Sequence, residues 1–151
     1  MVTKTAVVNA SPLINLAKIG RLNLLNDIFG KIVVPSAVLG EISGLDISEV
    51  VFTTLNIENR VAVQSLLGKL HDGEVEVIVG VQEIKADFAV LDDLDGRKYA
   101  MNIGLSVIGT LGILQRAKRL GLIVDLACDI AQLRNLGMYM SDSLVQKILS
   151  T

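Results

Sequence analysis

Short apolar segments alternate with amphipathic segments along most of this chain. The apolar segments predict strands over Thr5–Asn9, Ile32–Val34, Val51–Ile57, Phe88–Leu91 and Ser106–Ile108. Apolar residues at helical spacing predict helices over Pro12–Ile19, Leu22–Phe29, Ser36–Ile42, Glu58–Leu70, Gly73–Ile84, Gly96–Ile103, Leu111–Leu120, Leu126–Leu136 and Asp142–Leu149. This alternation is typical of an α/β domain with a mostly parallel sheet, in which Val51–Ile57 would be an edge strand.

Two of the predicted strands end in polar side chains. Asp92 and Asp93 directly follow the strand Phe88–Leu91, and Asn9 ends the first strand. In open parallel sheets, ligands bind outside the carboxyl ends of the strands. We therefore expect the chemistry of this protein at that edge of the sheet.

The composition indicates one aliphatic domain over residues 1–151. Hydrophobic residues make up 51% of the chain and aromatic residues only 3%. No apolar run approaches the roughly 20 residues that span a bilayer, and no signal-peptide pattern opens the chain. We therefore expect a cytoplasmic protein with no membrane contact, and the surplus of aliphatic residues favours a homodimer. The lone Cys128 cannot form an internal disulfide, and we expect it to be a small buried hydrophobic residue.

The charges are unevenly distributed. Residues 1–95 hold 7 basic and 13 acidic groups, whereas residues 96–151 hold 7 basic and 3 acidic groups. An acidic region beside a basic one would suit a metal centre next to bound phosphates, although ordinary solvated surface explains it equally well. The candidates for nucleic-acid contacts are Arg97, Lys98, Arg116 and Lys118, followed by Arg119 and Lys147.

Four segments, taken in order, resemble the PIN-domain family. They are VVNASPLINLAKIGRLNLL, VVPSAVLGEI, DGEVEVI and LDDLDGRKYA…GLSVIGTLGILQRAK. The resemblance runs from Val7 to about Leu149. Within the family, the segments most resemble a branch of small prokaryotic PIN-like proteins. It implies a three-layer α/β/α domain with a mostly parallel sheet, and a cluster of acids that holds Mg²⁺ or Mn²⁺ for RNA cleavage. It also implies that the protein could be the toxin of a toxin–antitoxin pair, with an antitoxin as partner.

The same resemblance implies a site made of Asn9, Glu41, Glu74, Asp92 and Asp93. Glu41, Glu74 and Asp92 would hold one cation, with Asp93 assisting and Asn9 completing the site. Hard divalent cations prefer oxygen ligands, and they make water acidic enough to attack phosphorus, so no Ser, Cys or His nucleophile is required. PIN nucleases generally present an aspartate where Asn9 stands, so we expect weaker metal binding here.

Several of these residues also have ordinary structural interpretations. Asp93 and Asp95 are favoured as helix caps, and Glu41 could be a solvent-facing charge. Glu76 is the alternative to Glu74, because residues two apart on a helix do not share a face. We expect structural roles for three further residues: Ser11 and Thr110 as helix caps, and His71 as a turn residue.

Two other functions remain open. A catalytically inactive PIN-like module that binds RNA or a partner protein would account for the uncharged Asn9. A regulator that binds a small molecule or nucleotide without a metal is disfavoured, because neither GxGxxG nor GxxxxGK[ST] is present.

Overall fold

The computed structural model describes residues 3–150. Within that range one sheet forms in the order β3-β2-β1-β4-β5, and every neighbouring pair is parallel. Its strands are β1 (Lys4–Val8), β2 (Gly30–Pro35), β3 (Phe52–Leu55), β4 (Phe88–Val90) and β5 (Val107–Ile108). The predicted parallel sheet is confirmed, and β3 is the edge strand that the sequence indicated.

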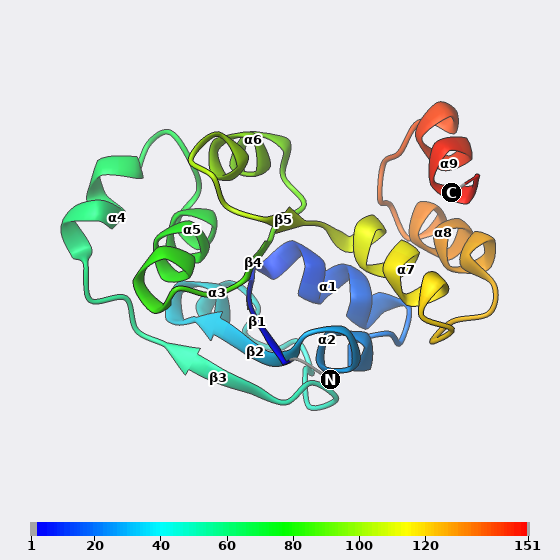
Figure 1. Ribbon diagram of the computed structural model, residues 1–151, viewed down its shortest axis with the longest axis horizontal. Helices are drawn as coiled ribbons and strands as arrows, with labels where there is room; N and C mark the ends of the chain where they lie inside the picture. The colour runs from blue at the N-terminus through cyan, green and yellow to red at the C-terminus, as the bar shows by residue number, and fades with distance from the viewer. Residues whose placement is uncertain (1–2, 151) are drawn as a thin grey trace.

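Helices cover both faces of this sheet (Figure 1). They are α1 (Ala10–Lys18), α2 (Asn23–Ile28), α3 (Ser36–Glu41), α4 (Arg60–Leu66), α5 (Asp72–Ile84), α6 (Leu94–Asn102), α7 (Thr110–Arg119), α8 (Leu126–Asn135) and α9 (Asp142–Leu149). Helix α5 packs on β1, β2 and β4, while α2 packs on β2 and on α7. Helix α8 packs on α7, and α9 packs on α8. The fold is therefore a three-layer α/β/α domain, as expected.

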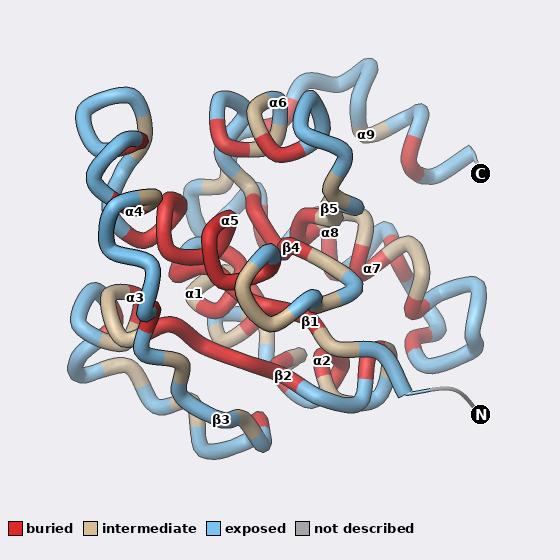
Figure 2. Tube along the Cα trace, turned by 60° about the vertical axis from the view of Figure 1, so that its left-hand side comes forward, coloured by how far each residue is buried: buried red, intermediate tan, exposed pale blue. Residues whose placement is uncertain are grey.

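The core is centred on β1, β2, β4 and α5, which are largely buried in Figure 2. Nine consecutive residues of α5, Gly73–Val81, are buried. A helix that is buried on all sides needs apolar residues all round, and the Val and Ile residues of this segment supply them. The same burial draws two carboxylates, Glu74 and Glu76, into the interior.

The structure shortens one predicted helix and moves the start of another. The segment Glu58–Leu70 was predicted helical throughout, but α4 ends at Leu66 because Leu67 is extended and Gly68 has a positive φ of 92°. The predicted helix Gly96–Ile103 begins instead at Leu94, since Asp93 caps it. The first change leaves residues 67–71 as a loop between α4 and α5, and the second makes Asp93 a helix cap.

The expectation of a buried Cys128 was wrong, because this cysteine is exposed. Helix α8 buries Leu126, Asp129, Ile130 and Leu133, which lie at the i, i+3, i+4 and i+7 positions of one face. Cys128 is not on that face. Its backbone N–H donates a hydrogen bond to Asp125 Oδ1 at 3.1 Å.

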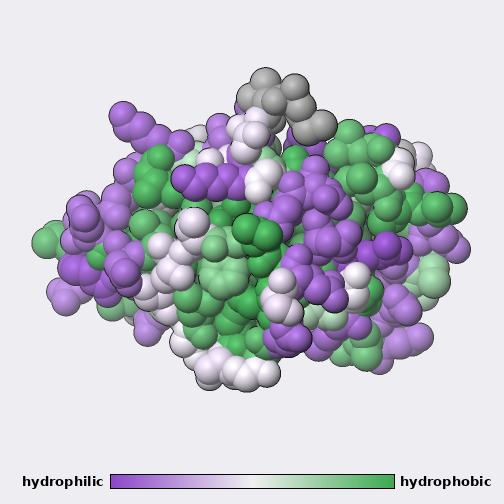
Figure 3. All heavy atoms as spheres, turned by 90° about the horizontal axis from the view of Figure 1, so that it is seen from below, coloured by the Kyte–Doolittle hydropathy of each residue, from purple (hydrophilic) through white to green (hydrophobic). Residues whose placement is uncertain are grey.

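Apolar side chains also reach the surface. In Figure 3, hydrophobic residues gather over the middle of the face seen from below and are bordered by hydrophilic ones. Among residues 3–150, no helix has both the length and the apolar character needed to cross a membrane. The hydrophobic composition of this chain is thus divided between an aliphatic core and exposed apolar surface.

Candidate functional site

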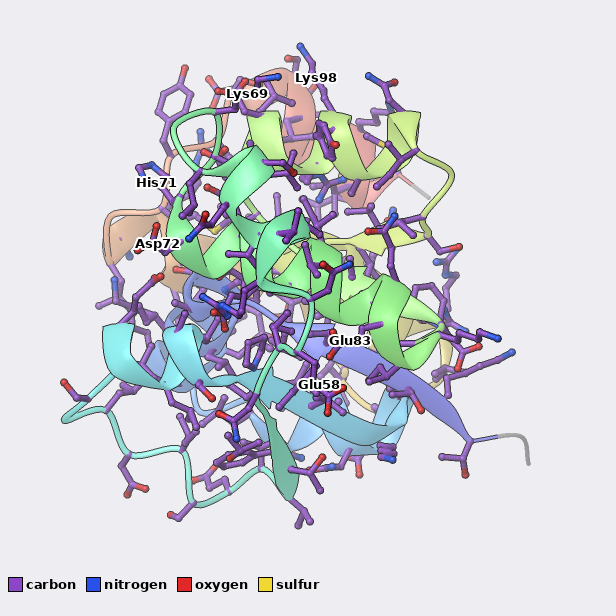
Figure 4. All side chains as sticks on the ribbon, turned by 90° about the vertical axis from the view of Figure 1, so that its left-hand side faces the viewer. Glu58, Lys69, His71, Asp72, Glu83 and Lys98 are labelled. Atoms are coloured by element: carbon purple, nitrogen blue, oxygen red, sulfur yellow. The ribbon has the colours of Figure 1, made fainter. Side chains whose placement is uncertain are left out.

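A cavity of about 590 Å³, which we call the acid cavity, opens where α5 and α6 begin. Its acidic lining residues are Glu41, Asp72, Glu74, Asp93 and Asp95, and its basic ones are Lys69 and His71. Figure 4 shows Lys69, His71 and Asp72 where the chain enters α5, and Lys98 on α6. With more acids than bases around it, this cavity attracts cations.

Asn9 and Glu41 meet over the backbone of α5. Asn9 follows β1 and is 6% exposed, and its Oδ1 is buried without a hydrogen-bond partner. Glu41 is the last residue of α3 and is exposed. Glu41 Oε1 and Asn9 Oδ1 both lie within 3.0 Å of the point that a Cβ on Gly73 would occupy. Only glycine at position 73 therefore lets these two oxygens approach the helix backbone together.

Glu74 and Asp93 both line the acid cavity and interact with each other. Glu74 Oε1 accepts a hydrogen bond from the His71 N–H at 3.2 Å, whereas Glu74 Oε2 is buried without a partner and packs directly on Gly96. Asp93 caps α6, accepting at Oδ2 from the N–H groups of Asp95 and Gly96 at 3.2 and 3.4 Å. Burial raises the pKa of Glu74 above its ordinary value; the hydrogen bond from His71 opposes this shift, and the charge of Asp93 adds to it. A positive charge between Glu74 and Asp93 would relieve both unfavourable effects.

Asp92 lies outside the acid cavity and is held by other residues. Its Oδ1 accepts from the Thr110 N–H at 2.7 Å, and its Oδ2 accepts from the Thr110 hydroxyl at 2.6 Å and the Asn15 amide at 3.0 Å. It lines a neighbouring cleft instead. The structure thus brings Glu41, Glu74 and Asp93 to the acid cavity. Asp92, although adjacent to Asp93 in sequence, lines the neighbouring cleft.

These oxygen donors include an amide as well as carboxylates. Within residues 3–150, no group of three or more His, Cys, Asp and Glu side chains is arranged to hold a metal ion. A cation at the acid cavity would therefore bind Asn9 Oδ1 and Glu41, with Glu74 or Asp93 and water completing its shell. Mg²⁺ commonly uses only one or two protein carboxylates and keeps several waters, so this donor set fits such an ion.

Three other predicted residues lie outside the acid cavity. Glu76 is buried and accepts from the Ala37 N–H at 3.2 Å and from Arg60 Nη1 at 3.0 Å, away from the acid cavity. The predictions of caps at Ser11 and Thr110 were wrong, because the N-caps of α1 and α7 are Asn9 and Gly109. Thr110 uses its hydroxyl to bind Asp92 instead.

The predicted nucleic-acid-binding residues separate into two groups. Arg97 lines the neighbouring cleft, and Lys98 is exposed on α6. On α7, Arg116 lies 5.8 Å from the centre of the Phe88 ring, and the Lys118 Nζ donates to a backbone carbonyl at 2.6 Å. The α6 residues therefore lie nearer the acidic segment, whereas those on α7 make contacts within the fold.

Sequence reasoning missed two contributors to the site. Lys69 lines the acid cavity from the loop that follows α4, a loop that was predicted to be helical. Gly73 was interpreted only as the start of a helix, although it underlies Asn9 and Glu41. The available signal was the DGE triplet at residues 72–74, which places a glycine between two acids.

A parallel sheet between two helical layers, with acids at its carboxyl edge, defines the structural class. The family model DUF3368, described as a PIN domain, matches residues 5–151. The chain belongs to the PIN-domain family, and it therefore has a nuclease-type fold. Comparison with curated proteins gave no match.

Proposed function

We propose that this protein is a metal-dependent ribonuclease whose acid cavity binds Mg²⁺ or Mn²⁺. The observation that carries the proposal is the buried, unpartnered Oδ1 of Asn9 beside the Glu41 carboxylate, both packed on Gly73. A buried polar atom without a partner is costly, and a bound cation would satisfy it. The second unpartnered oxygen, Glu74 Oε2, lies in the same acidic surroundings.

The residues around the acid cavity have distinct roles in this proposal. When bound, the ion would offset negative charge on the phosphodiester oxygens and make an attacking water more acidic. Glu74 holds a proton more tightly than an ordinary glutamate, and binding of a cation favours its release. Lys69, which lines the acid cavity, and the exposed Lys98 of α6 would contact the RNA backbone.

Membership of the PIN-domain family supports a nucleic-acid substrate. RNA as that substrate, a role as the toxin of a toxin–antitoxin pair, and an antitoxin partner are extensions drawn from the family resemblance. We further propose a homodimer, which the exposed apolar area in Figure 3 supports. Exposed apolar patches of this kind mark association surfaces in many proteins.

A calorimetric titration with Mn²⁺, paired with a cleavage assay on single-stranded RNA, tests the metal site. Glu41→Gln removes one charge at an exposed position, so the variant should fold normally. We expect at least about a tenfold loss of Mn²⁺ affinity and loss of cleavage, because a carboxylate ligand becomes neutral. Glu49→Gln is the matched control, since Glu49 is also exposed and lies outside the acid cavity. Equal affinity in wild type and Glu41→Gln would remove the proposed site.

A catalytically inactive PIN-like module that binds RNA or a partner protein is the second candidate. Two observations favour it: Asn9 brings no charge, and Asp92 is already bound by Thr110 and Asn15. In that case wild type would bind single-stranded RNA without binding Mn²⁺. Asn9→Asp, which adds the missing charge beside Glu41, would then create Mn²⁺ binding and cleavage.

A further inference from the structure

A second cavity, of about 450 Å³, lies beside the acid cavity, and we call it the α6–α9 cleft. Its walls come from the start of α6, from β5, from the first turns of α7 and from the chain around α9; they include Leu94, Arg97, Ile108, Leu111, Tyr139 and Leu144. The segment 92–97 separates the two cavities. Asp93 and Asp95 line the acid cavity, whereas Asp92, Leu94 and Arg97 line the cleft.

Large apolar side chains surround this cleft although they are open to solvent. Leu94 is 60% exposed, Tyr139 is 90% exposed and Leu144 is 39% exposed. Exposed apolar residues gathered around a concavity mark a binding site more often than a solvated surface. The volume also falls within the roughly 300–1,000 Å³ of typical small-molecule sites.

Charged and polar groups occupy the part of the cleft formed by the segment 92–97. Arg97 Nη1 donates to the Leu91 carbonyl at 3.4 Å, which orients the guanidinium. Both Arg97 Nη1 and Asp92 Oδ1 pack against Gly109, within 3.0 Å of the point that a Cβ there would occupy. The cleft thus combines a positioned cation with an aromatic ring and aliphatic walls.

We propose that the α6–α9 cleft binds one nucleotide of a single-stranded RNA, with its base on Tyr139 and Leu94 and its phosphate on Arg97. Nucleobases have apolar faces that stack on aromatic rings, and arginine binds phosphate oxygens through paired N–H groups. An apolar peptide would use the walls but would offer no phosphate to Arg97. Because the segment 92–97 borders both cavities, the next phosphodiester of the same RNA would lie at the acid cavity. This second placement rests on the proposed ribonuclease function, whereas binding of a nucleotide in the cleft is independent of it.

The test measures binding of a fluorescein-labelled ten-nucleotide single-stranded RNA by fluorescence anisotropy in EDTA. Tyr139→Ala should raise the Kd about tenfold, as expected for loss of one base stack, while Tyr139→Phe should bind like wild type. Because Tyr139 is 90% exposed, neither change should impair folding. Val124→Ala is the matched control, since Val124 is 86% exposed and lies outside the cleft.

The outcomes separate this inference from the proposed function. Weaker RNA binding by Tyr139→Ala with unchanged Mn²⁺ affinity would support a nucleotide site. Equal RNA binding by wild type and Tyr139→Ala, or no RNA binding by wild type, would overturn it and favour a peptide in the cleft. The RNA-binding measurement is made in EDTA and therefore does not depend on a metal. If wild type failed to bind Mn²⁺ in the calorimetric titration, only the proposed metal site would be overturned.

Discussion

Thr110 and Asp92 are joined by two hydrogen bonds that connect the first residue of α7 to the residues following β4. The backbone N–H and the hydroxyl of Thr110 donate to different oxygens of the Asp92 carboxylate. A carboxylate at a helix N-terminus is stabilised by the unpaired N–H groups and by the helix dipole. Asp92 therefore fixes the position of the segment 92–97, which separates the acid cavity from the α6–α9 cleft.

Thr110→Val should destabilise the protein, because it removes the hydroxyl donor while keeping the backbone N–H and the side-chain shape. Hydrogen bonds to charged groups contribute about 1.5–3 kcal/mol, so we expect a loss of that order in the free energy of unfolding, measured by urea denaturation. Thr110→Ser keeps the hydroxyl and should lose less. If Thr110→Val were as stable as wild type, the hydroxyl would not contribute to stability.

Gly73→Ala should weaken Mn²⁺ binding by at least about tenfold without unfolding the protein. The added methyl group would meet Glu41 Oε1 and Asn9 Oδ1, so both oxygens would have to move. Gly40→Ala is the matched control, because Gly40 is helical and nothing lies within 4 Å of its Cβ position. That control should gain up to about 1 kcal/mol from helix propensity and keep its Mn²⁺ affinity. Unchanged affinity in Gly73→Ala would show that these two oxygens bind no metal.

Glu76→Gln should lower stability but leave Mn²⁺ binding intact. Glu76 binds the Ala37 N–H and Arg60, and the Arg60 side chain is 57% exposed. Because solvent weakens the ion pair, we expect a loss of roughly 1.5 kcal/mol in the free energy of unfolding. Calorimetry and urea denaturation on the same variant check both statements. A fall in Mn²⁺ affinity as large as that of Glu41→Gln would instead place Glu76 at the metal.

The stability of the metal-free protein should depend on Glu74 through pH. Since its pKa is raised in the folded state, the folded protein binds this proton more tightly than the unfolded chain. The free energy of unfolding therefore falls as the pH rises from the ordinary glutamate pKa through the raised one. In EDTA, Glu74→Gln should show a smaller fall across this window than wild type.

The exposed Glu49→Gln variant serves as the control for that measurement and should follow wild type. Urea denaturation repeated at several pH values between about 4 and 8 supplies the comparison, because the ordinary glutamate pKa lies near 4.3. Identical pH profiles for wild type and Glu74→Gln would mean that Glu74 titrates alike in the folded and unfolded states.

The local hydrophobic pattern of the sequence determined the order of strands and helices. Apolar periodicity is a property of neighbouring residues, so it predicted the parallel α/β arrangement and placed Asn9 and Asp92 at the carboxyl ends of strands, whereas Glu41 and Glu74 were identified through the resemblance to the PIN-domain family. Helix boundaries were less predictable where they depend on caps, as at Asp93, which begins α6 earlier than the pattern indicated. The periodicity of apolar residues therefore predicts which segments are strands or helices, but not the residue at which each helix begins.

Tertiary packing decided which of the polar residues meet. Asp92 and Asp93 are adjacent in the chain, yet Thr110 and Asn15 hold the first while the second caps α6 beside Glu74. The cap at Asp93 is local, because its donors lie two and three residues further along the chain, whereas the partners of Asp92 are distant in sequence and left no local signal. Long-range packing also hid Tyr139, which lines the α6–α9 cleft because α8 packs on α7 and α9 packs on α8. The sequence by itself determined the fold, because its pattern is local, whereas long-range contacts determined which of its acidic residues lie together.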